Sequence, residues 1–290
     1  VEKYGKGGIV ARVVADSINN TGNRITTFEL EYHRYIHGEV MTHRLFGRNA
    51  MSSRAVPISK MIQQVKDNPA TPIHWGKNQS GMQSKVELVG FELEQAQNEW
   101  ALAAQSAVSH AEHLASYSGH KQIVNRLLEP FQMMKVVLTA TEFANFFWLR
   151  CDADAQPEIQ ELAKCMFEAM NESNPELLKV GEWHTPYVEH FRGSDGDAGV
   201  QYIVDNVGVS EEEAIAISSS CCAQVSYRNI DNSYDKAMTV YERLGVGGNK
   251  IHASPFEHLA MPMNNDHLED MHIRGDKWPE GITHFSSKGD

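Results

Sequence analysis

Residues 24–32 show the clearest alternation of apolar and polar side chains in the chain. Every second residue from Phe28 to Tyr32 is apolar and the two between them are glutamates, which is the period-two pattern of a half-buried strand. Residues 8–17, GIVARVVADS, predict a second strand, and the turn-forming sequence NNTGN separates the two. The pattern therefore predicts a β-hairpin.

Most of the remaining pattern is helical. Residues 85–117 predict the longest helix, and Pro157 begins another that runs to Met170, because proline is favoured in the first turn of a helix. Shorter helices are expected at 33–46, 58–67, 120–128, 141–150, 198–206, 210–218 and 233–244. Polar loops are expected at 68–81 and 261–290. A hairpin combined with an excess of helix predicts an α+β fold.

The composition is that of an ordinary globular protein. At 290 residues, with 41% hydrophobic and 22% charged residues, the chain can form one large domain or two modest ones. The formal net charge of −12 argues against a protein that coats nucleic acid, but it allows a local basic pocket that attracts an anionic substrate.

Targeting signals and metal-binding cysteine motifs are not evident in the sequence. No segment reaches the roughly 20 apolar residues of a membrane span, and the N-terminal sequence VEKYGKGGIV lacks a signal-peptide pattern. The four cysteines fit no CxxC metal pattern. A reduced, cytoplasmic protein is therefore expected.

Residues 42–54, THRLFGRNAMSSR, are the richest concentration of anion-binding side chains. Four of them are or can be cationic and three add neutral hydrogen-bond donors: His43, Arg44, Arg48 and Arg54, with Asn49, Ser52 and Ser53. Arginine suits bidentate contact with phosphate or carboxylate. The segment indicates a site for a small phosphorylated ligand, and the alternative is a solvated basic helix end.

The same segment resembles the signature of the flavin-dependent thymidylate synthases, the ThyX family, in which R-H-R is followed by seven residues and a serine. Here Thr42-His43-Arg44 is followed by seven residues and Ser52. Four other segments are similar to blocks of that family: N-F-F-W-L-R at 145–150 with A-Q-P-E-I-Q downstream, Arg126 four residues before Pro130, Q-V-S-Y at 224–227, and H-A-S-P-F-E-H at 252–258. Residues 57–118 and 185–215 are not clearly matched.

The order of these segments differs from the usual order of the family, in which the last two blocks precede the arginine signature. The resemblance therefore implies a ThyX-like fold, with a central antiparallel sheet flanked by helices, and a circularly permuted sequence. Residues 1–290 would form one catalytic domain, with a signature and nucleotide-binding part (1–184), a loop-rich connector (185–215) and a permuted flavin-binding segment (216–260). Permutation is tolerated when termini lie close together, so strand 24–32 is predicted to lie beside the segment following His258.

The resemblance also implies roles for individual residues. Arg150 would be the catalytic residue, a guanidinium that stabilises negative charge developing on the uracil ring. The dUMP site would comprise Ser52, Ser53, Arg54, Arg126 and Arg150. The FAD site would comprise His43, Arg44, Asn49, Asn145, Ser226, His252, Ser254 and Glu257.

Each of these roles has a structural alternative. Each arginine could instead form a salt bridge, Arg150 with Asp152 or Asp154, and each histidine could be a packed residue. Ser52 is assigned to nucleotide binding rather than covalent attack, because no carboxylate is clearly placed to orient His43 as its base.

Two further patterns compete with these assignments. Residues 183–187, W-H-T-P-Y, partly match the loop block assigned to 252–258, but they lack its F-E-H ending. His33 and His37 have the i, i+4 spacing of a metal-binding pair, but no third ligand is obvious, so no metal site is assigned.

Three positions depart from the family pattern. Thr42 stands in place of an arginine, Ala50 in place of a glutamate, and Asp154 where a histidine is frequent. These differences could alter the nucleotide, the reductant site or the fate of the one-carbon unit.

The activity implied by the resemblance is transfer of the methylene group of methylenetetrahydrofolate to dUMP, with FAD reduced by NADPH, in a homotetramer whose sites are shared between subunits. No nucleic-acid or membrane partner is expected. The departures leave open a hydroxymethylase that acts on dUMP or dCMP. A non-catalytic nucleotide- or flavin-binding protein is a third possibility, and a metal-dependent phosphohydrolase is a more distant one.

Overall fold

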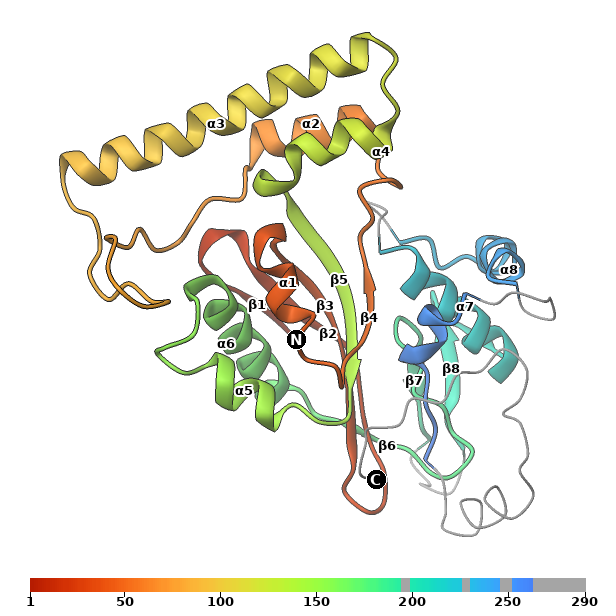
Figure 1. The fold of residues 1–290 in the computed structure, drawn as a ribbon. Helices are drawn as coiled ribbons and strands as arrows, with labels where there is room; N and C mark the ends of the chain where they lie inside the picture. The colour runs from red at the N-terminus through yellow and green to blue at the C-terminus, as the bar shows by residue number, and fades with distance from the viewer. Residues whose placement is uncertain (194–198, 226–229, 246–251, 263–290) are drawn as a thin grey trace.

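The computed structural model describes residues 1–193, 199–225, 230–245 and 252–262. Two parts lie side by side (Figure 1). The larger part is a sheet with helices on one face and at one end, and it extends from the N-terminus to residue 177. The smaller part is formed by the described residues from 183 onward, so the expected FAD-binding loop and the arginine-rich segment belong to different parts.

The larger part is built on a mainly antiparallel sheet in the order β1-β2-β3-β5-β4, with β6 parallel to one end of β2. Its strands are β1 (Glu2–Tyr4), β2 (Val10–Ile18), β3 (Arg24–His33), β4 (Gly47–Ala50), β5 (Met133–Ala140) and β6 (Glu176–Leu177). The predicted hairpin is confirmed, since β2 and β3 pair antiparallel. Asn19 closes their connection because its side-chain oxygen accepts from the N–H groups of Thr21 and Asn23, at 3.0 and 2.8 Å.

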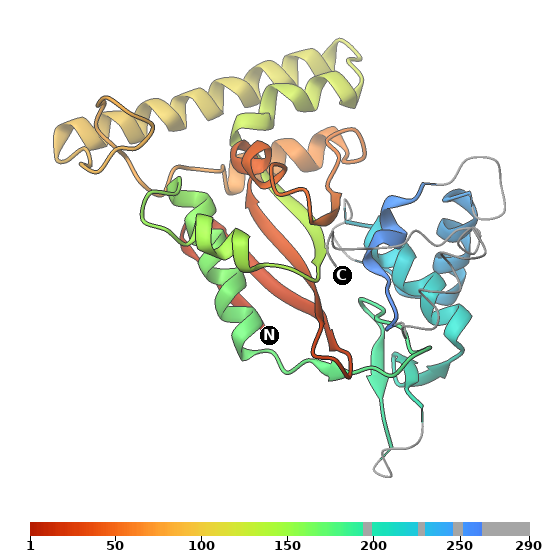
Figure 2. The ribbon, with the colours of Figure 1, turned by 60° about the horizontal axis from the view of Figure 1, so that its bottom comes forward.

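The alternating pattern of β3 explains how the core forms. Phe28, Leu30 and Tyr32 are fully buried in the main cluster of the larger part. Helix α6 (Pro157–Glu172) packs on this face and adds apolar residues at helical spacing, and Figure 2 shows the helix running along the strands. Complete burial of a side chain such as Phe28 contributes about 2–3 kcal/mol. The helix predicted to begin at Pro157 is therefore confirmed.

A second helical layer lies at the end of the sheet (Figure 1). It consists of α2 (Ile58–Asp67), α3 (Phe91–Ser116), α4 (Lys121–Val124) and the 3-10 helix η3 (Asn125–Phe131). The predicted helix at 58–67 is confirmed. The one predicted at 85–117 begins only at Phe91, because the preceding residues fold back as a short hairpin in which the N–H of Leu88 donates to the carbonyl of Trp75 at 2.7 Å.

Two other helix predictions were only partly right. The helix expected at 120–128 is a single α-turn followed by η3, which continues through Pro130 instead of stopping before it. The helix expected at 33–46 is reduced to η2 (Arg34–Ile36) and α1 (His37–Val40), because the chain must turn to enter β4 and pair with β5. The helix near 141–150 is α5 (Ala144–Arg150).

The smaller part combines a three-stranded sheet with two helices. Its elements are β7 (Glu189–Phe191), β8 (Gln201–Val204), β9 (Val207–Val209), α7 (Glu211–Ala223), α8 (Tyr234–Arg243) and the 3-10 helix η4 (Ser254–His258). The helices predicted at 210–218 and 233–244 are confirmed as α7 and α8. Ser210 caps α7 because its hydroxyl accepts from the N–H of Glu213 at 3.2 Å.

The helix predicted at 198–206 was wrong. Residues 201–209 form the β8–β9 hairpin, in which Tyr202 and Val204 are buried on one face. Its two turn residues, Asp205 and Asn206, have φ of 50° and 65°. A two-residue hairpin turn needs this left-handed conformation, and Asn and Asp adopt it more readily than most residues.

A chain of buried hydrogen bonds joins the two parts. Ser17 Oγ lies 2.8 Å from Nδ1 of His184, whose Nε2 lies 2.9 Å from the hydroxyl of Thr27. That hydroxyl is 2.7 Å from the hydroxyl of Thr139, which is 2.8 Å from Nδ1 of His258. All five side chains are buried, so the smaller part is fastened to the sheet by polar groups that have no access to water.

The segment following His258 reaches β3 through His184. The N–H of His184 donates to the carbonyl of Ala260 at 2.7 Å, and its ring contacts Thr27 in β3. The strand partners of β3 are β2 and β5, so this segment approaches β3 without pairing with it.

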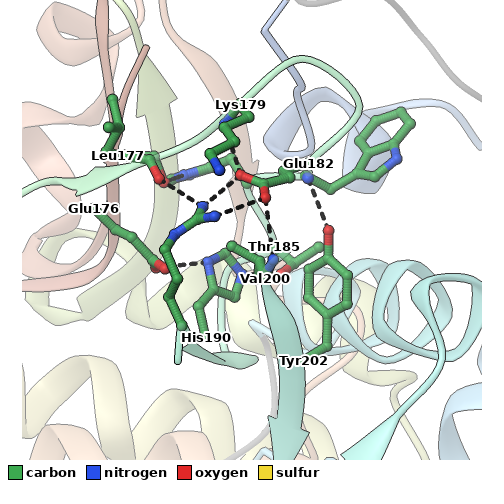
Figure 3. Close-up of polar contacts among 12 residues, drawn as sticks. Glu176, Leu177, Lys179, Glu182, Thr185, His190, Val200 and Tyr202 are labelled. Atoms are coloured by element: carbon green, nitrogen blue, oxygen red, sulfur yellow. Dashed lines mark hydrogen bonds and ion pairs between the residues drawn. The ribbon is translucent and has the colours of Figure 1, made fainter. Parts of the chain in front are cut away.

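A second polar cluster lies where the chain passes from β6 to β7, and Figure 3 shows its side chains converging. The two ring nitrogens of His190 contact Glu176 at 2.8 Å and Thr185 at 2.7 Å. Arg192 donates to the carboxylate of Glu182 at 2.5 Å. These contacts connect β7 to the edge of the main sheet.

Candidate functional site

Arg150 lies at the C-terminal end of α5, where it meets the arginine-rich segment. Its Nε donates to Nε2 of His43 at 2.9 Å, and its Nη2 donates to the hydroxyl of Thr42 at 3.3 Å. Helix α5 places Arg150 there because Phe146, one turn earlier, is buried in the core. Arg150 does not pair with Asp152 or Asp154, and the partner of Asp154 is Lys85 at 3.7 Å.

His43 is held between aromatic rings. Its ring centroid lies 4.8 Å from that of Phe146, edge to face, and 5.8 Å from that of Phe46. Burial and the nearby cations Arg150 and Arg48 lower the pKa of His43 to about 4. His43 is therefore a neutral acceptor for Arg150 at neutral pH, and the positive charge of the pair stays on Arg150.

Arg150 opens onto a groove of about 1100 Å³. One wall is the hairpin that contains His74 and Lys85, and another is the start of α6 with Glu158 and Lys164. Glu39, from α1, lies in the lining near Arg150. The groove thus carries charges of both signs, with Arg150 among its cations.

A smaller cavity of about 550 Å³ lies between the sheet and the smaller part. Its lining charges are largely paired: Arg12 contacts Glu2 at 2.6 Å and Glu29 at 3.4 Å, and the hydroxyl of Tyr187 donates to Glu29 at 3.0 Å. None of the predicted site residues lines it. We therefore place the candidate site at the larger groove.

Arg126 and Ser53 meet at a different place, on the carboxylate of Glu129. Oε1 of Glu129 accepts from Arg126 at 2.7 Å, from Arg34 at 2.9 Å and from Ser53 at 3.2 Å. The salt bridge that was the alternative for Arg126 is thus present, although the Arg126 side chain is 55% exposed and can still reach a ligand. Two guanidinium groups on one carboxylate leave the cluster with net positive charge.

The rest of the predicted dUMP site adjoins this cluster. Ser52 and Arg54 precede and follow Ser53, and Ser52 Oγ accepts from the backbone N–H of Arg54 at 3.3 Å. The side chain of Asn125 donates to the carbonyl of Ser53 at 2.7 Å and fixes the turn. Arg54 is exposed.

The two groups of residues stand at opposite ends of β4. Thr42 and His43 precede this strand and Ser52 to Arg54 follow it. Its four residues span roughly 13 Å at about 3.3 Å per residue. Within one chain, therefore, the predicted uracil contact Arg150 and the predicted phosphate contacts do not form a single cluster.

The predicted FAD residues divide in the same way. Arg44 and Asn145 are exposed, and each lies next to or on the same helix as the Arg150 group. Asn49 is buried in β4, where its amide donates to the carbonyl of Cys222 at 3.1 Å. Its amide nitrogen therefore connects β4 to α7.

Three of the remaining FAD candidates lie in η4 or just before it, and η4 packs against β4. His252 and Ser254 are exposed, whereas Glu257 is half-buried. Burial raises the pKa of the Glu257 carboxyl, and Arg48 of β4 acts on it in the opposite direction. Ser226 lies outside the described residues.

The competing segment at 183–187 lies at the junction between the smaller part and the sheet. His184 is fully buried between Ser17 and Thr27, and Thr185 is buried beside His190. Burial lowers the pKa of His184 to about 3, so the ring is neutral. This segment fastens the smaller part to the sheet.

The two histidines with metal-like spacing also have protein partners. His33 contacts the carbonyl of Gly7 at 2.7 Å and the hydroxyl of Tyr35 at 2.8 Å, and His37 contacts the hydroxyl of Tyr32 at 2.8 Å. Within the described ranges no group of three His, Cys, Asp or Glu side chains is arranged to hold a metal ion. All four cysteines are free thiols. None of the described helices has both the length and the apolar character needed to cross a bilayer.

Three residues of these clusters were not identified from the sequence. Glu39 lines the groove near Arg150, and Arg34 and Glu129 complete the cluster around Arg126. The i, i+3 spacing of Arg126 and Glu129 was an available signal for their pairing. Nothing in the local pattern around Glu39 or Arg34 indicates their position, because it depends on how α1 and η3 pack.

More than half of the chain matches a known protein family. Residues 24–176, more than half of the 290-residue chain, match the family model described as thymidylate synthase complementing protein. No curated protein matches the chain. The matched range runs from β3 to β6 and contains Arg150, Arg126 and the segment 42–54, whereas η4 and α7 lie outside it.

Proposed function

This chain belongs to the thymidylate synthase complementing protein family, the ThyX family, and on that premise we propose that it is a flavin-dependent thymidylate synthase. The reaction is the reductive methylation of dUMP to dTMP. Methylenetetrahydrofolate provides the carbon, and NADPH provides the reducing equivalents. The family supports a one-carbon transferase, and the particular substrates are our proposal.

The observation that carries this proposal is the contact between Arg150 and His43. The two residues are 107 positions apart in the sequence and come from two segments that resemble different blocks of the family. Their hydrogen bond fixes a guanidinium at the mouth of a groove of about 1100 Å³, which is large enough for a nucleotide beside a second planar ligand.

Arg150 would act by holding a positive charge against the pyrimidine. Its Nε and Nη2 are held by His43 and Thr42, so the guanidinium is preorganised before the substrate binds. A fixed cation stabilises negative charge on a ring without reorganising during the reaction. Because His43 is neutral, the positive charge that stabilises the ring is carried by Arg150 and not by the histidine.

The predicted flavin-binding residues fit a flavin only in part. Arg44 is exposed and, among the described residues, has no hydrogen-bond or ion-pair partner, so its guanidinium is available to a diphosphate. Asn145, His252 and Ser254 are also exposed and can donate hydrogen bonds. Asn49 does not fit, because its amide is bonded to the smaller part. When bound, FAD would supply the hydride that completes the methyl group.

A second copy of the chain would complete the dUMP site. Ser52, Ser53, Arg54 and Arg126 lie beyond the far end of β4 from Arg150. If Arg150 of one subunit faces these residues of another, the phosphate and the base of one nucleotide are held together. On this ground we propose sites shared between subunits, within the homotetramer that the family resemblance implies.

The circular permutation is part of the same proposal. The η4 block resembles a segment that usually precedes the arginine signature, and it packs against β4 while His258 bonds to Thr139 of β5. A segment distant in sequence thus adjoins β4, the strand that lies within the signature segment. This arrangement supports the proposal that residues 1–290 form one catalytic domain in permuted order.

The test is product formation by the purified protein. Incubation with dUMP, methylenetetrahydrofolate, FAD and NADPH should yield dTMP, identified by its mass, and the protein should take up flavin and turn yellow. A protein that neither contains flavin nor takes up added FAD would contradict the proposal and favour the non-catalytic alternative.

A second candidate is a hydroxymethylase that acts on dUMP or dCMP. The observation that favours it is the groove lining, where the carboxylate of Asp154 lies in the place of a frequent family histidine. The same incubation, repeated with dCMP, separates the two functions, because a hydroxymethyl product is 16 Da heavier than a methyl product, about the mass of one oxygen atom.

A further inference from the structure

Glu39 occupies the groove from the side of α1, next to the residues that hold Arg150. Its backbone carbonyl accepts from the hydroxyl of Thr42 at 2.6 Å, and that hydroxyl in turn accepts from Arg150 at 3.3 Å. The side chains of Glu39 and Arg150 both line the groove. The positive charge of Arg150 acts on the Glu39 carboxyl, so the two groups face a common space.

Among the residues that the structure describes, the carboxylate of Glu39 has no partner. Its Oε2 is buried, and within the described ranges neither carboxylate oxygen accepts a hydrogen bond or forms an ion pair. Burial raises the pKa of the Glu39 carboxyl, and Arg150 acts in the opposite direction. A buried carboxylate oxygen without a hydrogen-bond donor is unfavourable because it has lost its contacts with water, so a ligand that brings a donor is favoured at this position.

Arg150 provides the complementary half of this arrangement. Nε and Nη2 are occupied, whereas Nη1 has no hydrogen-bond partner among the residues that the structure describes. The groove therefore offers one free guanidinium donor and one unpaired carboxylate acceptor. A ligand edge that carries an acceptor next to an N–H donor satisfies both.

We propose that Glu39 is a base-recognition residue, whose carboxylate accepts the ring N3–H of uracil while Arg150 donates to an adjacent carbonyl oxygen. This inference rests on the proposed function, since it assumes that dUMP binds at Arg150. Uracil presents an N–H between two carbonyl oxygens, which is the pattern that the pair matches. Glu39 thereby selects the base, and Arg150 both holds and activates it.

The test compares the binding of dUMP and 3-methyl-dUMP, in which a methyl group replaces the N3 hydrogen. Dissociation constants are measured by titration calorimetry with the FAD-loaded protein. Wild-type protein should bind dUMP more tightly by about 10- to 100-fold, as expected for a charge-assisted hydrogen bond. Glu39→Ala should bind dUMP weakly and distinguish the two nucleotides by less than about 3-fold, because the acceptor is gone.

Two further variants separate recognition from structural damage. Glu39→Gln keeps the size and a neutral acceptor, so its discrimination should lie between those of wild type and Glu39→Ala. Glu112→Ala removes a carboxylate on α3 outside the groove, one that contacts Lys66 at 2.7 Å, and its discrimination should equal that of wild type. A loss of structure at residue 39 would weaken the binding of dUMP and 3-methyl-dUMP alike, and the difference between their dissociation constants would remain.

The outcomes distinguish this inference from the proposed function. If wild type binds dUMP and Glu39→Ala discriminates as strongly as wild type, the inference is wrong and the proposed function stands. If wild type binds both nucleotides equally well, N3–H is not recognised and the inference is likewise wrong. If wild type with FAD bound does not bind dUMP, both are overturned.

Discussion

The guanidinium of Arg150 donates from Nε to Nε2 of His43 across 2.9 Å. A ring nitrogen that accepts a hydrogen bond carries no proton, so the neutral imidazole has its hydrogen on Nδ1. The depressed pKa of His43, about 4, agrees with this assignment, because burial and Arg150 both oppose a second positive charge. The pair therefore behaves as one fixed cation with a neutral support.

Replacement of Arg150 by alanine should reduce dTMP formation by about 100- to 1000-fold, as expected when a preorganised charge is removed from a developing anion. FAD should stay bound, because Arg44, His252 and Asn145 are untouched. Arg150→Lys should recover little activity, since one ammonium group cannot bond both His43 and Thr42 while facing the base. Product is measured by mass and flavin by absorbance, and substantial turnover by Arg150→Ala would contradict the assignment.

Shared sites predict that two inactive variants restore each other. Arg150→Ala and Arg126→Ala should each be inactive as purified proteins. Mixed oligomers should regain activity, because a site between unlike subunits can combine an intact Arg150 from one with an intact Arg126 from the other. Mixing either variant with itself is the control. If mixing restores nothing, although subunits are shown to exchange, both arginines act within one chain.

The elements that could be predicted correctly are those whose structure is determined by residues close together in the sequence. The β2–β3 hairpin and α6 follow from period-two and helical spacing and from the turn residue Asn19, so the sequence predicted them correctly. The helix expected at 198–206 failed because the turn at Asp205 and Asn206 depends on a left-handed conformation. The alternation of the buried residues Tyr202 and Val204 is a local period-two pattern that is typical of a strand.

The contacts among the predicted site residues could be foreseen only in part. Sequence blocks indicated Arg150 and His43, and the structure brings them within 2.9 Å. The engagement of Asn49 with Cys222 could not be foreseen, because it depends on α7 packing against β4 from 173 residues away. The cluster on Glu129 likewise requires Arg34 and Arg126 to meet from separate elements.

Acid should destabilise the protein through its buried histidines. Burial lowers the pKa of both His184 and His258 to about 3 from an ordinary value of 6.5. Between these values the unfolded chain binds protons that the folded chain does not, so the free energy of unfolding falls as pH decreases from about 6.5 toward 3. Each histidine contributes a slope of up to about 1.4 kcal/mol per pH unit.

Chemical denaturation at pH 7, 6 and 5 measures this slope. His258→Gln should make the dependence shallower, although it lowers stability at pH 7, because the glutamine does not titrate. His110→Gln, which replaces an exposed histidine on α3, is the control and should leave the slope unchanged. An unchanged slope in His258→Gln would show that this ring is protonated equally in both states.

Removal of the Thr139 hydroxyl should weaken the junction between the two parts. It is bonded to Thr27 at 2.7 Å and to Nδ1 of His258 at 2.8 Å, and Nε2 of His258 is already buried without a partner among the described residues. Thr139→Val keeps the shape but leaves the ring of His258 with no hydrogen bond at all. The free energy of unfolding should fall by about 1–3 kcal/mol, the cost of an unsatisfied buried group.

Thr139→Ser restores the hydroxyl and is the matched variant. It should lose less stability than Thr139→Val, because only a methyl group is removed. Since η4 begins at Ser254 and His252 directly precedes its cap, Thr139→Val should also bind FAD more weakly than Thr139→Ser when flavin binding is titrated by absorbance. Equal stability of the two variants would mean that packing, rather than the hydrogen bonds of Thr139, holds η4 against the sheet.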